Sequence, residues 1–135
     1  MSEARIIVPL RLLVADDDAT LREIVCEGLV DEGFEVVPAE DGERALELFR
    51  TRGPYDALLL DEEMPGLTGR QLLGVIRAQN DLVPVLLLSG NLVMEDDERS
   101  ALGVGPVLLK PVTIRELAQA VRQAVAAGAG RSVSP

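Results

Sequence analysis

The chain has 135 residues, of which 47% are apolar and 27% charged, a balance typical of one globular domain rather than a disordered chain. Thirteen Lys and Arg residues against 23 Asp and Glu residues give a net charge of −10, which disfavours nucleic acid as a partner because its phosphates would be repelled. The sequence has no histidine, which excludes Ser-His-Asp and Cys-His catalysis, imidazole metal ligands and a phosphohistidine within these residues.

Five apolar runs of strand length follow one another along the chain. They cover residues 11–15, 35–39, 57–60, 83–88 and 107–109. The third and fourth runs are continuously apolar, as expected for strands that are covered on both faces in a parallel sheet. Their short length favours strands over helices.

Segments with helical periodicity separate these runs. Apolar residues on one face predict amphipathic helices in the first and last segments, at Leu21, Ile24, Val25 and Leu29, and at Ile114, Leu117, Ala118, Val121 and Val125. The segment at residues 91–102 has a weaker apolar stripe and an acidic run at 95–98 that is typical of a solvated helix start. A fourth helix is expected there.

Residues able to cap a first turn indicate where the helices begin. Asp41 is expected to open the second helix, and Asp18 is expected to cap the first helix rather than bind a metal ion. Three threonines are followed three positions later by Glu or Gln, the spacing of a capping box, at Thr20 with Glu23, Thr68 with Gln71 and Thr113 with Glu116.

Five repeats of strand followed by helix predict an α/β fold with a parallel sheet, right-handed crossovers and helices on both faces. The predicted domain covers residues 10–127. Residues 1–9 are expected to form an N-terminal extension, and residues 128–135 a flexible C-terminal tail rich in Ala, Gly and Ser.

Polar residues end four of the predicted strands, and in an open α/β sheet these ends meet where ligands bind. They are Asp16, Asp17 and Asp18, then Asp61, then Ser89 and Gly90, and finally Lys110. Gathered carboxylates repel one another unless a cation neutralises them, and oxygen ligands without His or Cys suit Mg²⁺ or Mn²⁺. An aspartate beside a metal ion and a lysine is equipped to attack phosphorus, which would yield an aspartyl phosphate. Single acids after strands are common turn and cap residues, so the hypothesis depends on their joint placement.

Five short motifs carry a resemblance to a known family. They are LVADDD at 13–18, YDALLLD at 55–61, MPG at 64–66, LSG at 88–90 and LKP at 109–111. In this order and at these spacings they resemble the receiver domains of bacterial two-component response regulators, the CheY-like family. The resemblance implies a doubly wound (βα)5 flavodoxin-like sandwich whose five-stranded parallel sheet has the order 2-1-3-4-5.

The resemblance also implies a role for each matching acid. Asp61 would be the phosphoacceptor and a metal ligand. Asp17 would bind Mg²⁺ directly, Asp16 would act mainly through metal-bound water, and the backbone carbonyl of Glu63 would complete the protein ligands. Gly66 and Gly69 are expected to shape the loop after Asp61.

Two further residues would address the phosphoryl group. The Ser89 hydroxyl matches the position that turns toward it, and Lys110 matches the lysine that pairs with it. The Lys110–Pro111 bond is expected to be cis, which only a bond before proline adopts at low cost.

The sequence departs from the family where Val107 replaces the usual Tyr or Phe three residues before the lysine. An aromatic ring that swings inward with the hydroxyl is therefore missing, so either the switch is transmitted differently or the domain mainly relays phosphoryl groups. Glu63 and Asn91 occupy positions that in the family tune the lifetime of the phosphoryl group.

The function implied by the resemblance is that of a phosphoacceptor switch in a two-component or phosphorelay system. A sensor histidine kinase or histidine phosphotransfer protein would donate the phosphoryl group to Asp61, and Mg²⁺-assisted hydrolysis would remove it. The chain would catalyse only its own phosphorylation and dephosphorylation. No output domain is expected after residue 127, so the signal would pass through contacts with a downstream protein, as a monomer or a weak phosphorylation-linked dimer.

The expected location is the cytoplasm, without membrane contact. No apolar run of about 18 residues and no signal peptide are recognisable. The single cysteine, Cys26, excludes an intramolecular disulfide and a multi-cysteine metal site, and it is expected in the core.

Three alternatives compete with this interpretation. A receiver module of a hybrid histidine kinase would have the same chemistry inside a longer protein. A pseudo-receiver would keep the fold and only bind partners; the complete set of matching acids, hydroxyl and lysine disfavours it, whereas Val107 favours it. The motif at residues 16–20 also fits a haloacid-dehalogenase-like phosphatase, in which Asp96 and Asp97 would supply an acidic pair. In that family the lysine precedes the acidic pair, whereas Lys110 follows it.

Overall fold

The computed structural model describes residues 8–79, 81–90, 95, 97, 98, 103 and 107–132. Their five strands are β1 (Arg11–Ala15), β2 (Glu35–Ala39), β3 (Ala57–Asp61), β4 (Val85–Ser89) and β5 (Val107–Leu109). All neighbours pair in parallel, in the order β2-β1-β3-β4-β5. This order confirms the predicted doubly wound sheet.

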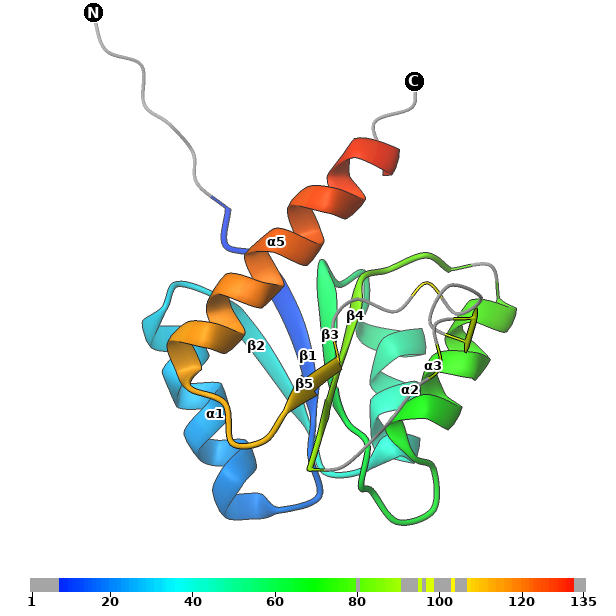
Figure 1. Ribbon diagram of the computed structural model, residues 1–135, viewed down its shortest axis with the longest axis horizontal. Helices are drawn as coiled ribbons and strands as arrows, with labels where there is room; N and C mark the ends of the chain where they lie inside the picture. Colours follow the sequence, from blue (N-terminus) through cyan, green and yellow to red (C-terminus); the bar gives the residue numbers. More distant parts are fainter. Residues whose placement is uncertain are drawn as a thin grey trace, which may run out of the picture.

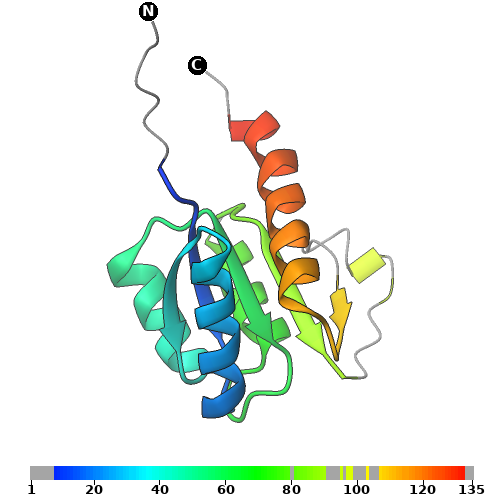
Figure 2. The same cartoon turned by 90° about the vertical axis from the view of Figure 1, so that its left-hand side faces the viewer.

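The helices in the described part of the chain are α1 (Ala19–Asp31), α2 (Gly42–Arg52), α3 (Gly69–Ala78) and α5 (Ile114–Ser132). Helices α1 and α5 cover one face of the sheet, and α2 and α3 cover the other (Figure 1). Figure 2 views the molecule from the side of α1 and α5, which lie across the sheet. The predicted arrangement of helices on both faces is confirmed.

Two hydrophobic clusters fill the space between the sheet and its helices. Successive residues of a strand point to opposite faces, so Leu13 and Leu58 pack with α2 and α3, whereas Leu12 and Leu59 pack with α1 and α5. Every residue of β3 and β4 is buried. Burial on both faces explains why these strands read as continuous apolar runs.

Strand β4 begins at Val85, later than the predicted start at residue 83. Pro84 has no N–H to donate to the ladder, although its carbonyl accepts a hydrogen bond from Leu58 N at 2.9 Å. At the other end, β3 and β4 include Asp61 and Ser89 as their last residues. Both polar residues are therefore held by the sheet itself.

Side-chain caps begin four helices as predicted. The side chains of Asp18 and Asp41 accept hydrogen bonds from Leu21 N and Arg44 N. Capping boxes join Thr68 with Gln71 and Thr113 with Glu116. The predicted capping box of Thr20 with Glu23 is wrong, because Asp18 already caps α1 and Thr20 lies inside its first turn.

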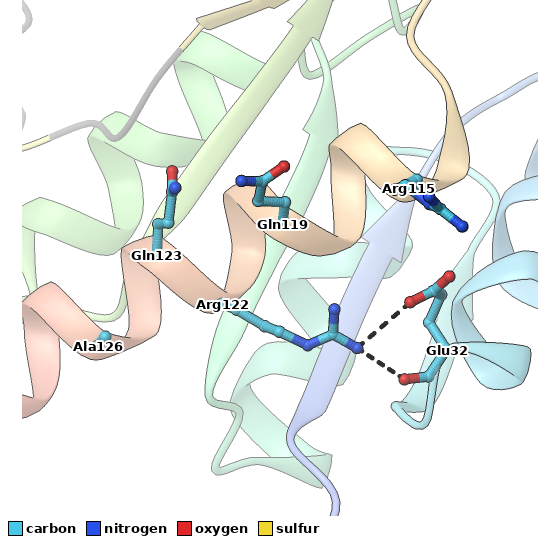
Figure 3. Close-up of a pocket in the computed structure, with 6 residues that line it drawn as sticks. All are labelled: Glu32, Arg115, Gln119, Arg122, Gln123 and Ala126. Atoms are coloured by element: carbon cyan, nitrogen blue, oxygen red, sulfur yellow. Dashed lines mark hydrogen bonds and ion pairs between the residues drawn. The ribbon is translucent and has the colours of Figure 1, made fainter.

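Helix α5 is tied to the end of α1 by Arg122. Its guanidinium donates to the backbone oxygen of Glu32 at 2.8 Å and to the Glu32 carboxylate at 3.4 Å (Figure 3). The same guanidinium lies 4.9 Å from the centre of the Phe34 ring, where a cation–π interaction forms. These contacts hold α5 against the C-terminal end of α1.

Four further sequence predictions concern the domain end, the helix at 91–102, Cys26 and membrane spans. Helix α5 continues to Ser132, past the predicted domain end at residue 127, and the domain boundaries stay a prediction. The predicted helix at 91–102 lies outside the described residues except at 95, 97 and 98. Cys26 is only half-buried, at the margin of the α1–α5 cluster. No helix formed by the described residues is long and apolar enough to span a membrane.

Candidate metal and phosphoryl site

Three carboxylates meet at the carboxyl edge of the sheet. Asp16 and Asp17 follow β1, and Asp61 ends the neighbouring strand β3; one oxygen from each lies within 4.8 Å of the others. Asp16 is 6% and Asp61 4% exposed, whereas Asp17 is exposed. The side chain of Asp18 instead caps α1. The structure therefore brings together the three acids that the sequence selected and leaves out the fourth.

Lys110 reaches the same cluster from the end of β5. Pairing of β4 with β5 continues through Lys110 N, which donates to Ser89 O at 2.8 Å. The Lys110–Pro111 bond is cis, as predicted. The side-chain Nζ donates to Asp61 Oδ1 at 2.9 Å. Lys110 is the only lysine in the sequence, where the other twelve basic residues are arginines.

The electrostatics of the pair favour a charged lysine. Burial alone would lower the pKa of Lys110, but its hydrogen bond to Asp61 and the carboxylates of Asp16 and Glu63 raise that pKa above the usual value. The compact ammonium therefore stays protonated beside the acidic cluster.

The carboxylate of Glu63 occupies the remaining space between Ser89 and Lys110. Ser89 is fully buried, and its Oγ donates to Glu63 Oε2 at 2.5 Å. Gly90 N donates to Glu63 Oε1 at 3.3 Å, and Lys110 Nζ lies 3.9 Å from the same oxygen. The sequence assigned a metal-binding role only to the backbone carbonyl of Glu63, so this side-chain contact is new information from the structure.

Comparison with known proteins agrees with this geometry. The protein-family model described as the response regulator receiver domain matches residues 12–122 of the chain. The chain belongs to this family. Its relatives include the uncharacterized transcriptional regulatory protein YcbL of Bacillus subtilis, which is 36% identical over 117 residues, or 84% of this chain and 50% of that protein. The chain spans about half the length of the curated relatives it matches.

Solved receiver structures are also similar. The receiver domain of the Francisella response regulator 1452 has a TM-score of 0.80 at 33% identity, covering 88% of this chain and 98% of that one. The response regulator TrrA of Thermotoga maritima, solved in complex with Mg²⁺ and BeF, has a TM-score of 0.75 at 34% identity, covering 85% and 98%. Membership of this family decides against the haloacid-dehalogenase-like phosphatase.

The loop after Asp61 packs closely against α3 in this receiver. A Cβ on Gly69 would lie 2.8 Å from the Asp61 backbone oxygen, so a larger residue would displace the acid. Gly66 has a φ of +80°, which favours glycine in the turn. The Glu62 carboxylate accepts from Arg70 N at 2.7 Å, and burial raises the pKa of Glu62. Both glycines therefore hold the loop as the sequence predicted.

Val107 is partly buried in the cluster formed by α2 and α3. At the position where the family usually has an aromatic residue, this receiver therefore has an aliphatic side chain packed against its core. Asn91, the other predicted tuning residue, lies outside the described part of the chain.

A recess of about 390 Å³ adjoins the acidic cluster. Its walls come from the residue after β1, from α1, the end of β4, the turn after β5 and α5, with the residues Asp16, Leu21, Val25, Leu88, Lys110, Pro111, Val112 and Leu117. Leu21 and the nearby Ile24 are exposed. The receiver site therefore opens onto a largely apolar surface between α1 and the turn that contains Lys110.

Asp16 carries an electrostatic cost in this receiver. Burial raises the pKa of Asp16, and the Asp61 carboxylate raises it further, against the hydrogen bond from Asp18 N at 2.9 Å. Replacing Asp16 with Asn keeps an oxygen for Asp18 N and removes the buried charge. We expect Asp16→Asn to increase the free energy of unfolding at neutral pH by about 1 kcal/mol, within the range of ordinary substitutions.

The pH dependence of this difference has a defined sign. Because the pKa of Asp16 is raised in the folded state, its stabilising contribution is complete below the ordinary Asp pKa of about 4 and is lost as the pH rises through the folded-state pKa. Urea unfolding in EDTA should show that the free energy of unfolding of wild type falls relative to that of Asp16→Asn as the pH rises from about 4 through the folded-state pKa of Asp16. Asp17→Asn, at an exposed position, is the control. A difference between wild type and Asp16→Asn that is constant with pH would contradict the expectation.

Proposed function

We propose that this receiver domain is a phosphoacceptor switch that takes a phosphoryl group from a phosphohistidine onto Asp61. The proposal rests on one observation: the buried Asp61 carboxylate lies in one cluster with the carboxylates of Asp16 and Asp17, and its Oδ1 is 2.9 Å from the Lys110 ammonium. Carboxylates on one side suit a divalent cation, and the lysine supplies fixed positive charge on the other. A phosphoryl group bound to Asp61 would lie between these charges.

The donor set fits Mg²⁺. Asp16, Asp17 and Asp61 offer only oxygen, and their mutual repulsion makes a cation favourable. With the backbone carbonyl of Glu63, they would hold Mg²⁺, which when bound would neutralise the cluster and the phosphoryl oxygens. The complex of the similar regulator TrrA with Mg²⁺ and BeF supports this choice of ion, and no finding favours Mn²⁺.

The chemistry is a transfer between two nucleophiles. Both hydrogen bonds to the Asp61 carboxylate, from Lys110 Nζ and Glu63 N, are accepted by Oδ1. Oδ2 accepts neither of them, so we assign it the attack on phosphorus. As the new P–O bond forms, the P–N bond to the donor imidazole breaks and its electron pair returns to the nitrogen. Hydrolysis then removes the phosphoryl group: water attacks phosphorus, the P–O bond to Asp61 breaks, and phosphate leaves.

A phosphohistidine donor has to lie outside these 135 residues. These 135 residues contain no histidine, so a histidine kinase or histidine phosphotransfer protein is proposed as the partner. The apolar recess beside Asp16 and Lys110 supports docking of such a protein, because it gives a partner access to the cluster from the α1 side. The signal would then pass to a further protein.

The proposal is tested by incubating the protein with acetyl phosphate, a small acyl phosphate, and Mg²⁺. We expect intact-mass spectrometry to show one added phosphoryl group that hydroxylamine removes, and no addition in EDTA. The pseudo-receiver alternative predicts no addition under either condition. Binding of beryllofluoride, followed by two-dimensional amide NMR, gives an independent measurement of the same site.

A further inference from the structure

We propose that the Glu63 side chain is a built-in competitor of the phosphoryl group, which holds the receiver in its unphosphorylated state until it is displaced. This inference rests on the proposed function and adds a regulatory role for one residue at the same site. It depends on the position of the Glu63 carboxylate, which the sequence did not predict.

The Glu63 carboxylate is bound by a complete set of anion-binding groups. It accepts hydrogen bonds from Ser89 Oγ at 2.5 Å and from Gly90 N at 3.3 Å, and Lys110 Nζ lies 3.9 Å away. A hydroxyl, a backbone N–H and an ammonium are the donors that a phosphoryl group requires. In the free protein, a carboxylate of the chain already occupies them.

Ser89 cannot serve both acceptors at once. A serine hydroxyl has one proton to donate, and the Ser89 side chain is fully buried. When Ser89 donates to a phosphoryl oxygen, the Glu63 carboxylate loses its shortest hydrogen bond. It would also lie beside a second anion, and like charges at this distance repel. Glu63 and the phosphoryl group therefore exclude each other from Ser89.

The Glu63 side chain is free to leave while its backbone stays. The backbone N–H donates to Asp61 Oδ1 at 3.3 Å, which anchors the residue next to the phosphoacceptor. The side chain is 48% exposed, so rotation about its own bonds moves the carboxylate into solvent. Each phosphorylation then requires breaking the contacts to Ser89 and Gly90, which lowers the apparent affinity of the site for a phosphoryl group.

The test uses beryllofluoride, which mimics a phosphoryl group on an aspartate, at saturating Mg²⁺. Glu63→Ala removes the competitor, and Glu63→Gln keeps its shape but removes the charge that Lys110 faces. Glu62→Gln is the matched control, because it removes one charge from the adjacent residue, whose carboxylate binds Arg70 N instead. Amide NMR titrations give the dissociation constant and show that each variant is folded.

We expect Glu63→Ala to bind beryllofluoride about tenfold more tightly than wild type, the change that results from losing one charge-assisted competing contact. Glu63→Gln should also bind more tightly, and Glu62→Gln should match wild type. In the free protein, the Ser89 and Gly90 amide signals of Glu63→Ala should move toward their positions in the beryllofluoride complex of wild type.

The outcomes separate this inference from the function on which it rests. If wild type binds beryllofluoride and both Glu63 variants bind it equally or more weakly, the competitor role is wrong and the phosphoacceptor function stands. If tighter binding also occurs in Glu62→Gln, general charge reduction explains it, and the competitor role is again wrong. If neither wild type nor any variant binds, the proposed function itself fails.

Discussion

Asp61→Asn is expected to abolish phosphorylation by acetyl phosphate while leaving the protein folded. A carboxamide is almost the same size as a carboxylate, and its oxygen still accepts from Lys110 Nζ and Glu63 N, which now both bind Asp61 Oδ1. It has no anionic oxygen with which to form an acyl phosphate. Intact-mass spectrometry should show no added phosphoryl group, compared with one group in wild type.

The matched control is Asp18→Asn. Asp18 lies in the same acidic run, but its side chain caps α1 through a hydrogen bond from Leu21 N, and asparagine is an equally good cap. This variant removes one charge near the site and should be phosphorylated normally. Undiminished, hydroxylamine-sensitive label in Asp61→Asn would show that the phosphoacceptor is another residue.

The strands of this receiver could be predicted because local sequence and burial agree. Strands β3 and β4 are buried on both faces of the sheet, so each gives a short, continuous apolar run, which favours a strand over a helix. The start of β4 was misplaced because Val83 extends the apolar run, whereas the ladder depends on N–H donors and Pro84 has none. Strand order does not follow from periodicity at all, and only the resemblance to receivers supplied it.

Helix starts depend on which of several possible caps is nearest the first turn. Asp18 and Thr20 are both suitable cap residues, and the sequence predicted Asp18 as the cap of the first helix as well as a capping box of Thr20 with Glu23. The structure uses Asp18 because its backbone is extended there, with a ψ of 110°, and its side chain reaches Leu21 N. The chain therefore enters α1 two residues earlier than the capping box predicted.

The candidate site was predictable where topology alone places residues together. Parallel strands end at the same edge of the sheet, so Asp16, Asp61 and Lys110 meet as soon as the strand order is known. The Glu63 contact was missed because it joins residues 26 positions apart through side-chain conformation. Neither periodicity nor motif spacing contains information about a rotamer. The acidic residue two positions after Asp61 was the available signal: the sequence assigned Glu63 a backbone metal contact and a role in tuning phosphoryl lifetime, but no contact with Ser89.

Lys110 is the second residue whose removal should have a large effect. Its ammonium faces both Asp61 at 2.9 Å and the Glu63 carboxylate at 3.9 Å, so it lies on the phosphoryl side of the acidic cluster. Lys110→Ala should weaken binding of beryllofluoride about a hundredfold, since hydrogen bonds between charged groups contribute roughly 1.5–3 kcal/mol. Lys110→Met, which retains most of the side-chain length, should behave similarly if charge rather than packing is responsible.

Mg²⁺ binding provides the internal comparison for both Lys110 variants. The ammonium repels a cation at the cluster, and its loss leaves the three carboxylates with less positive charge around them, so Mg²⁺ should bind as tightly as in wild type or more tightly. Calorimetric titrations with Mg²⁺ alone, and then with Mg²⁺ and beryllofluoride, separate the two affinities. An equal loss of both would place Lys110 among the residues that support the whole acidic cluster. Loss of beryllofluoride binding alone would assign its charge to the phosphoryl group, because only that ligand adds negative charge where the ammonium lies.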